Sequence, residues 1–193
     1  MGFEDETWWS RFERPSLHSW AEWGQPMRLI DKEAIKGDTD PKALAAYGML
    51  VRTKEADREI REQMWLRFVE GRPVGTITTQ FLEYSCQKLV AMSKKALLMI
   101  WDNASWHTSK EVRSWIASHN REVKYSGEGV RIVSCLLPKK SPWLNAIEPK
   151  WIHCKRKVIE PEELIDAEEL ADRVCRVFGC AHDPHLSIPQ EVA

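Results

Sequence analysis

The segment LLMIWDNASWH, residues 97–107, decides the fold class of this chain. The run from Ala96 to Trp101 is short and continuously apolar, which predicts a strand buried on both faces of a sheet. Asp102 follows directly, and open α/β sheets place their ligands at the carboxyl ends of such parallel strands. An aspartate at a strand end also commonly turns the chain into the next helix. The segment therefore predicts a buried parallel strand and leaves Asp102 open between a chemical and a structural role.

Outward from this strand, strand-like and helix-like patterns alternate along the chain. Further strands are predicted at 43–53, 63–69 and 130–137, the last of them halted by Pro138. Helices are predicted at 76–92, from Thr108 onward, from a start within 145–148, and at 166–178. This alternation predicts an α/β layered fold. Residues 1–42 show no clear pattern.

Residues with capping chemistry mark the starts of several predicted helices. Two pairs have capping-box spacing, Thr108 with Glu111 and Asp166 with Glu169. Pro149 fits the first turn of a helix, because its missing amide hydrogen has no partner to lose there. Glu148 then lies in the same first turn, where a glutamate also interacts favourably with the helix dipole. The role of Glu148 is therefore open in the same way as that of Asp102.

The composition of the 193 residues fits one compact domain. Hydrophobic residues make up 43% and charged residues 30%, which favours a folded core over disorder. No apolar run approaches the roughly 18 residues of a membrane span, so none is expected. The acidic start at residues 4–6 argues against a secretory signal. Five cysteines without a paired framework are expected to be reduced thiols in a cytosol.

The charge of the chain is balanced overall but uneven along its length. The net charge is −1, so any electrostatic binding of nucleic acid must be local. Residues 138–157 hold six basic residues and only one acidic residue, Glu148. The basic residues are Lys139, Lys140, Lys150, Lys155, Arg156 and Lys157. Such a patch is suited to a phosphate backbone.

Three segments together resemble the catalytic domain of the mariner-like insertion-sequence transposases, which are DDE-type endonucleases. The family has a strand ending in Asp-Glu, a strand ending in Asp-Asn-Ala-x-x-His, and a block that runs from Leu-Pro to Ile-Glu-x-x-Trp. Here these blocks read Asp5-Glu6, Asp102-Asn103-Ala104-x-x-His107, and Leu137-Pro138 through Glu148 to Trp151. Trp20-x-x-x-Gly24 also matches the family pattern. The resemblance covers nearly the whole chain.

The resemblance implies a fold and an activity. The fold is a ribonuclease-H-like α/β mixed sheet flanked by helices, as in the catalytic core of retroviral integrases. Residues 1–160 are expected to form the catalytic domain, and residues 161–193 a C-terminal helix and tail packed on it or appended to it. The activity is metal-dependent cleavage and strand transfer of DNA at insertion-sequence ends. DNA and a second copy in a homodimeric synaptic complex are the expected partners, in the nucleoid of a bacterial cytoplasm.

The family implies that Asp5, Asp102 and Glu148 form the catalytic and metal-binding triad. Two Mg²⁺ or Mn²⁺ ions about 3.5–4 Å apart stabilise the attacking and leaving oxygens of an in-line displacement. Magnesium takes few protein carboxylates and completes its octahedron with water and phosphate oxygens, so three acids suffice. Asn103, His107 and Asn145 are candidates for supporting this site. The asparagines would orient metal-bound water or DNA, and His107 would contact a phosphate or support Asp102. Turn and cap positions for the asparagines, and packing at a helix entry for His107, are the alternatives.

The N-terminus departs from the family pattern. Only four residues precede Asp5, whereas the family has a buried strand and an end-binding helix-turn-helix region there. Most of the first strand is therefore expected to be missing, with Asp5 poorly fixed and the chain marginally stable by itself. A DNA-binding segment encoded upstream is an expected partner. The 45 residues between Asp102 and Glu148 are more than in the better-known branches of the family.

Other hypotheses stay open. The chain could be a truncated, inactive transposase remnant or regulatory fragment, or another nuclease of the same fold such as a resolvase. Trp8, Trp9, Trp106 and Trp143 lie near the three acids in sequence, and one of them could stack on an unpaired base. Zinc binding near the C-terminus is a further possibility, but the spacing of its cysteines and histidines matches no standard pair of ligand pairs. The residues concerned are His153, Cys154, Cys175, Cys180, His182 and His185.

Overall fold

A computed structural model describes residues 1–10, 43–54, 59–70, 75–158 and 165–188. Within these ranges the chain forms a five-stranded mixed sheet with strand order β3-β2-β1-β4-β5. The strands are β1 (Gly2–Ser10), β2 (Ala43–Lys54), β3 (Ile60–Glu70), β4 (Ala96–Trp101) and β5 (Arg131–Leu136). The helices are α1 (Gly75–Ala91), α2 (Lys110–Ser126), the short 3-10 helix η1 (Pro142–Leu144), α3 (Glu148–Val158) and α4 (Ala167–Phe178). The Trp20–Gly24 pattern lies outside the described residues.

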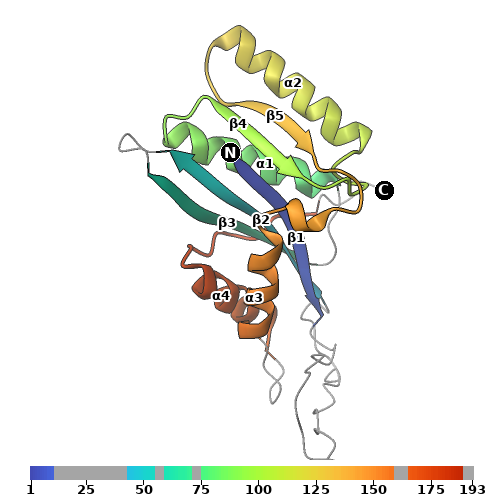
Figure 1. The fold of residues 1–193 in the computed structure, drawn as a ribbon, viewed down its shortest axis with the longest axis vertical. Coiled ribbons are helices and arrows are strands. Elements are labelled where there is room, and N and C mark those ends of the chain that lie inside the picture. The colour runs from blue at the N-terminus through green and yellow to red at the C-terminus, as the bar shows by residue number, and fades with distance from the viewer. Residues whose placement is uncertain (11–42, 55–58, 71–74, 159–164, 189–193) are drawn as a thin grey trace, which may run out of the picture.

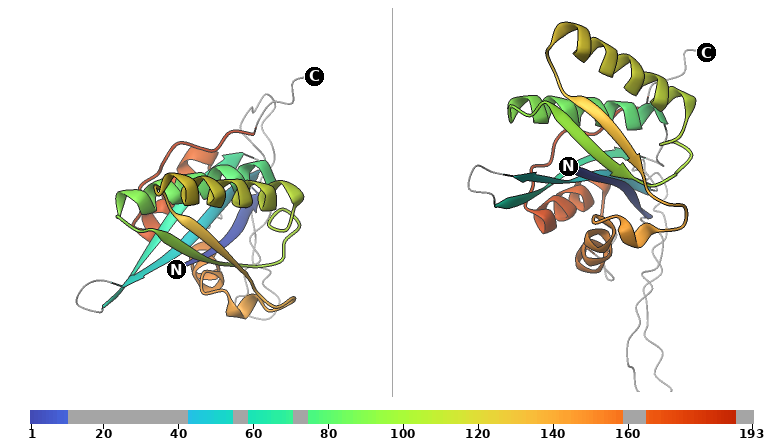
Figure 2. Two further views of the ribbon diagram at one scale, coloured as in Figure 1. Left: turned by 90° about the horizontal axis from the view of Figure 1, so that it is seen from above. Right: turned by 45° about the horizontal axis from the view of Figure 1, so that its top comes forward.

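The helices form two layers, one on each face of the sheet (Figures 1 and 2). Helices α1 and α2 lie on one face, above a core that includes Tyr47, Phe81 and Met99. Helices α3 and α4 lie on the other face, above a second core that includes Phe68 and Trp151. The predicted fold, an α/β mixed sheet flanked by helices, is confirmed. None of the helices in the described part of the chain is long and apolar enough to span a membrane.

Strand β1 lies at the centre of the sheet and is longer than the sequence suggested. It pairs antiparallel with β2 along its whole length, from Gly2 opposite Val51 to Ser10 opposite Ala43. It also pairs parallel with β4 at Gly2 and Phe3. The expectation that most of this strand is missing was wrong, because the strand continues for five residues beyond Asp5. Asp5 therefore lies inside the ladder with β2, two residues beyond the pairing with β4, and not at a loose end.

The burial of β4 and β5 also differs from the prediction. In β4 only one face is buried, with Leu97, Met99 and Trp101 inside and Leu98 41% exposed. In β5 only Ile132 is buried. Strand β4 was predicted to be buried on both faces, and this was wrong for a physical reason. Strand β5 is an edge strand. On the face of the sheet where α3 and α4 lie, these helices pack mainly over β1, β2 and β3.

The helix starts follow local chemistry closely. Asp166 caps α4 by accepting a hydrogen bond from the Glu169 amide, as predicted. Helix α3 starts at Glu148, with Pro149 in its first turn. The predicted cap of α2 is wrong by one residue, because Ser109 accepts from the Val112 amide. Thr108 instead donates its hydroxyl hydrogen to the Ala104 carbonyl.

The segment after α4 runs beside the edge strand β3 and reaches α1. The Leu186 amide donates to the Phe68 carbonyl at 2.7 Å, and Arg67 donates to the Pro184 carbonyl. On α1, Tyr84 donates to Asp183 at 2.6 Å. These bonds hold residues 180–188, hereafter the C-terminal segment, between the two helical layers.

Candidate active site

Three carboxylates predicted as a triad come from three separate elements. Asp5 lies in β1, Asp102 directly follows the adjacent parallel strand β4, and Glu148 is the first residue of α3. Helix α3 reaches this place because Gly48, the β2 residue opposite Asp5, carries no side chain. A Cβ atom on Gly48 would collide with the Trp151 ring and meet Ile147 at 3.0 Å. The start of α3 thus packs directly on the sheet beside Asp5.

The negative charges of these residues act on one another. Burial, followed by repulsion from Glu148, Glu6, Glu4 and Asp102, raises the pKa of Asp5 to about 9. Burial and the charge of Asp102 raise the pKa of Glu148. The site is therefore short of positive charge, and a cation bound there would relieve the repulsion.

Asp102 differs from the other two acids because the protein itself stabilises its charge. It accepts a hydrogen bond from His107 Nδ1 and one from the Ala104 amide, each at 2.8 Å. The bond from His107 is the main reason why the pKa of Asp102 is lowered. Both bonds reach Oδ1, and the side chain is still 51% exposed, so Oδ2 remains open to a ligand.

His107 is buried and contacts three carboxylates. Nδ1 bonds Asp102, Nε2 bonds Glu6 Oε1 at 3.0 Å, and Glu4 Oε2 forms an ion-pair contact with Nε2 at 3.1 Å. Burial alone would lower the pKa of His107, but these carboxylates raise it well above its ordinary value, which favours the protonated ring. The Trp101 ring stacks on it with centroids 4.6 Å apart. Of the alternatives for His107, the geometry favours support of Asp102.

Glu4 and Glu6 are functional candidates that the sequence reasoning did not single out. Both are buried on the face of β1 opposite to Asp5, next to His107. Burial and the charge of Glu6 raise the pKa of Glu4 to about 7, although His107 acts in the opposite direction. The available signal was the run of three acids at residues 4–6, of which a strand places Glu4 and Glu6 on one face and Asp5 on the other. A buried strand face tolerates such acids only with a buried partner of opposite charge.

The two asparagine candidates fix the backbone around the site. Asn145 is buried and donates from Nδ2 to the Glu4 carbonyl at 3.0 Å, which ties the approach to α3 to β1. Asn103 donates from Nδ2 to the Leu137 carbonyl at 2.5 Å, which ties the end of β4 to the end of β5. Both side chains therefore position the segments that carry the three acids.

The donor set of the candidate triad consists of carboxylate oxygens, which hard divalent cations prefer. In the described residues, Glu4, Glu6 and His107 form one of two groups whose ligand atoms lie within 4.8 Å of one another. Asp5, Asp102 and Glu148 do not form such a group, so their oxygens are spread more widely. The repulsion that raises the pKa of Asp5 and the oxygen-only donors fit Mg²⁺ or Mn²⁺.

The predicted basic residues lie on two sides of the acids. Lys139 and Lys140 line a cavity of about 390 Å³ together with Asp102 and Asn103. On α3, Lys155, Arg156 and Lys157 are exposed. Lys150 is also exposed, but it is partly neutralised by Glu62, 3.5 Å away. Of the four tryptophans considered above as candidates for stacking on a base, Trp8 and Trp143 are at least half exposed. Trp9 instead packs on Trp151, and Trp106 packs on His107.

Comparisons with known proteins agree with this geometry. The family model of the DDE superfamily endonucleases matches residues 58–171, more than half of the chain. The match includes Asp102 and Glu148 and begins after Asp5. No curated protein matches the sequence.

Several solved structures share the fold. A Mos1 transposase paired-end complex with the left transposon end has a TM-score of 0.57 and 14% identity, over 94% of this chain and 48% of that chain. A Mos1 mariner paired-end complex with Mn has a TM-score of 0.56 and 14% identity, over 92% and 47%. The Mos1 strand transfer complex has a TM-score of 0.55 and 13% identity, over 93% and 47%. The ribonuclease-H-like fold is thereby confirmed, and the chain spans about half the length of these proteins.

Proposed function

Because this chain belongs to the DDE superfamily of endonucleases, we propose that it is the catalytic domain of a transposase that cleaves and joins DNA at the ends of a mobile element. The observation that carries this proposal is the mutual repulsion of Asp5, Asp102 and Glu148, three carboxylates contributed by different elements. A protein keeps such unrelieved charge in one place at a cost in stability, which is typical of functional sites.

The alternative of an inactive remnant is not favoured. A remnant would be expected to lack the central strand, but β1 is paired on both sides. The Met1 carbonyl also accepts a hydrogen bond from the Arg52 amide at 2.8 Å. Pairing with β2 and β4 therefore anchors the strand that carries Asp5, which supports the proposal of an active enzyme.

The proposed metal ligands are Asp5, Asp102 and Glu148, with Mg²⁺ or Mn²⁺ as the ions. Two bound ions would supply Lewis-acid stabilisation of the attacking and leaving oxygens of the phosphodiester. The chain's own contribution is to hold the ligands still. His107 fixes one oxygen of Asp102, and Asn145 fixes the β1 backbone next to Asp5. Ligands held in this way need no reorganisation when the substrate arrives.

DNA is the proposed substrate and partner. Lys139, Lys140, Lys155, Arg156 and Lys157, with Lys150 at the margin, are proposed to contact phosphates and not bases. The matched Mos1 structures are complexes that contain transposon ends. The proposal includes a homodimer in the synaptic complex and an end-binding segment encoded upstream, since the Mos1 chains are about twice as long as this one.

A plasmid-nicking assay with Mg²⁺ or Mn²⁺ tests the proposal. Asp5→Asn, Asp102→Asn and Glu148→Gln should each reduce nicking by about 100-fold or more, because each removes a charge that stabilises the transition state through the metal. Glu128→Gln is the matched control, since Glu128 is exposed and follows the C-terminal end of α2, whose opposite end is the one that follows Asp102 in the chain. Equal nicking by the wild type and the three variants would show that the nuclease lies elsewhere.

A further inference from the structure

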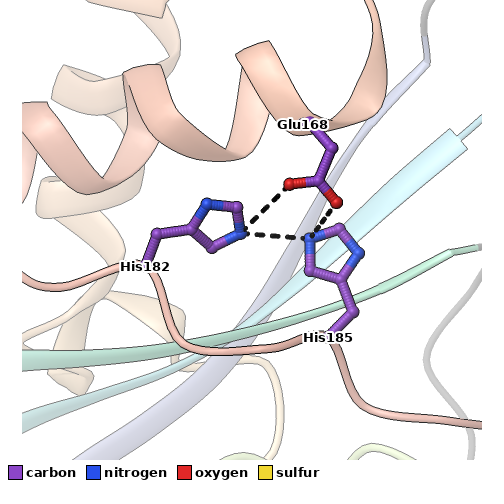
Figure 3. Close-up of side chains that lie close together, drawn as sticks. All are labelled: Glu168, His182 and His185. Atoms are coloured by element: carbon purple, nitrogen blue, oxygen red, sulfur yellow. Dashed lines mark hydrogen bonds and ion pairs between the residues drawn. The ribbon is translucent and has the colours of Figure 1, made fainter.

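A second group of potential metal ligands lies away from the acidic site, where the C-terminal segment passes α4. Glu168 projects from the first turn of α4 toward His182 and His185 on the C-terminal segment (Figure 3). The Nε2 atoms of the two histidines are 3.2 Å apart. Oxygen atoms of Glu168 lie 3.9 Å from His182 Nε2 and 3.7 Å from His185 Nε2. One ligand atom from each residue lies within 4.8 Å of the other two.

These distances are close to those of a tetrahedral metal site. Zinc–nitrogen bonds of about 2.0–2.1 Å place two ligand nitrogens about 3.3 Å apart in a tetrahedron. The two histidines already meet this requirement. The two Glu168 distances belong to different oxygens, Oε2 and Oε1, so the carboxylate has to shift to bring one oxygen near both histidines; its side chain is 72% exposed and free to do so.

The protein holds the two rings in an orientation suited to binding. Asp172 accepts a hydrogen bond from His182 Nδ1 at 2.7 Å, which places the proton on Nδ1 and leaves a lone pair on Nε2. Both rings pack against Phe68, with centroids 5.5 and 5.7 Å away. A carboxylate behind a ligating histidine and a packed ring face are the supports that metal-binding histidines usually have.

We propose that Glu168, His182 and His185 bind one Zn²⁺ ion, with water as the fourth ligand. Two imidazole nitrogens and one carboxylate suit zinc better than magnesium, which prefers oxygen ligands alone. Of the residues that the sequence suggested, His182 and His185 belong to this group, Glu168 completes it, and no cysteine belongs to it in the described residues. Cys175 and Cys180 instead direct their thiols at backbone carbonyls, those of Ala181 and Cys175.

The ion would have a structural role. It would join the first turn of α4 to the C-terminal segment, which in turn bonds β3 and α1. Helix α4 packs on α3, the helix that begins with Glu148. A zinc ion here would therefore stabilise the layer that carries the third acid of the candidate active site, without taking part in its chemistry.

A zinc titration against a chromogenic chelator tests the proposal, in excess Mg²⁺ so that the oxygen-only site is saturated. The wild type should bind one Zn²⁺, and its Tm should rise. Glu168→Gln and His185→Ala should weaken zinc binding by about 100-fold, and Asp172→Asn by about 10–100-fold. His153→Gln, which changes an exposed histidine on α3, is the matched control and should bind like the wild type.

X-ray absorption by the zinc-loaded protein gives an independent result. Nitrogen and oxygen neighbours at about 2.0–2.1 Å are expected, and no sulfur at about 2.3 Å. Sulfur in the coordination shell would overturn the proposal. Zinc binding by the wild type that is too weak to compete with the chromogenic chelator would also overturn it. So would an unchanged zinc affinity of Glu168→Gln. Because Glu168 is exposed, misfolding of this variant would not explain such a result. None of these outcomes bears on nicking by the acidic site.

Discussion

At the scale of single residues, the candidate active site depends on one buried positive charge. His107 faces Glu4, Glu6 and Asp102, and the ring is closed off from solvent. Removing one partner of a buried ion pair leaves an uncompensated charge, which is costly. His107 therefore stabilises the fold as well as orienting Asp102.

Replacement of His107 should consequently destabilise the protein more than loss of a packed ring alone. We expect His107→Ala to lower the free energy of unfolding by about 3–5 kcal/mol at neutral pH, measured by denaturant unfolding. Because His107 lowers the pKa of Glu4, that pKa should rise above about 7 in the variant, and Glu4 should take up a proton at neutral pH. Adding Glu4→Gln to His107→Ala should recover part of the stability. A His107→Ala variant as stable as the wild type would contradict this role.

The raised pKa of Asp5 predicts how stability depends on pH in the metal-free protein. A carboxyl with a pKa of about 9 when folded and 3.8 when unfolded favours folding fully below about pH 4, and this contribution is lost as pH rises toward 9. One pKa unit is about 1.4 kcal/mol, and 1 kcal/mol is roughly 2–4 °C in Tm at this size. In a chelator, Tm at pH 5.5 should exceed Tm at pH 8.5 by at least about 3 °C.

Two controls separate this effect from other titrations. Asp5→Asn should flatten the pH dependence, because the amide does not ionise. Saturating Mg²⁺ should raise Tm chiefly at pH 8.5, where the carboxylates are charged. A metal-free wild type that becomes more stable as pH rises would show that Asp5 ionises freely.

At the scale of elements, the position of α3 depends on the contact between Trp151 and Gly48. Because β2 has no side chain at this point, the helix approaches the sheet closely enough to bring Glu148 beside Asp5. The rigid Trp151 ring cannot move aside as a flexible side chain would. The distance between two of the candidate catalytic acids is therefore set by a glycine on a third element.

Gly48→Ala should displace α3 and separate Glu148 from Asp5. Overpacking of this kind costs about 1–3 kcal/mol, and nicking should fall by at least about 10-fold even in the fraction that is folded. Trp151→Phe in the Gly48→Ala background should relieve the clash and restore part of the activity. As a control, Gly127→Ala at the end of α2 should lower stability through its left-handed backbone and leave nicking by the folded protein unchanged. Full activity of Gly48→Ala would show that the contact does not set this distance.

At the scale of the whole molecule, the charges are distributed so that a nearly neutral protein has a basic region beside its acids. The net charge of −1 gives no general attraction for DNA. The exposed basic residues of α3 and the Lys139–Lys140 loop lie on either side of the candidate site. DNA binding by this protein is therefore expected to be local and sensitive to salt.

Charge reversal on α3 tests this distribution. Arg156→Glu together with Lys157→Glu should weaken binding of all duplexes by roughly 10-fold or more, and should reduce the slope of log K against log salt by about 0.9 for each lost phosphate contact. Fluorescence anisotropy with two unrelated duplexes measures both. Lys124→Glu, on the exposed side of α2, should have no such effect. A loss confined to one duplex would indicate base reading instead of phosphate contact.

The sequence by itself determined the α/β class, the order of most elements and the starts of α3 and α4. These features depend on periodicity, proline and capping residues such as Asp166, which act within a few residues of the chain. The motifs around Asp102 and Glu148 also indicated the family directly. The strand limits of β1 were missed, because nothing in residues 1–10 alone shows that β2 and β4 will pair with it.

Only the tertiary structure decided which groups face one another. His107 bonds Glu6 across 101 residues of sequence, and Asn145 bonds the Glu4 carbonyl across 141. The burial of β4 and β5 depends on which helices cover them, and the group of Glu168, His182 and His185 depends on a bend of the chain after α4. Contacts of this kind arise from the packing of distant elements, so their chemistry becomes visible only when the chain is folded.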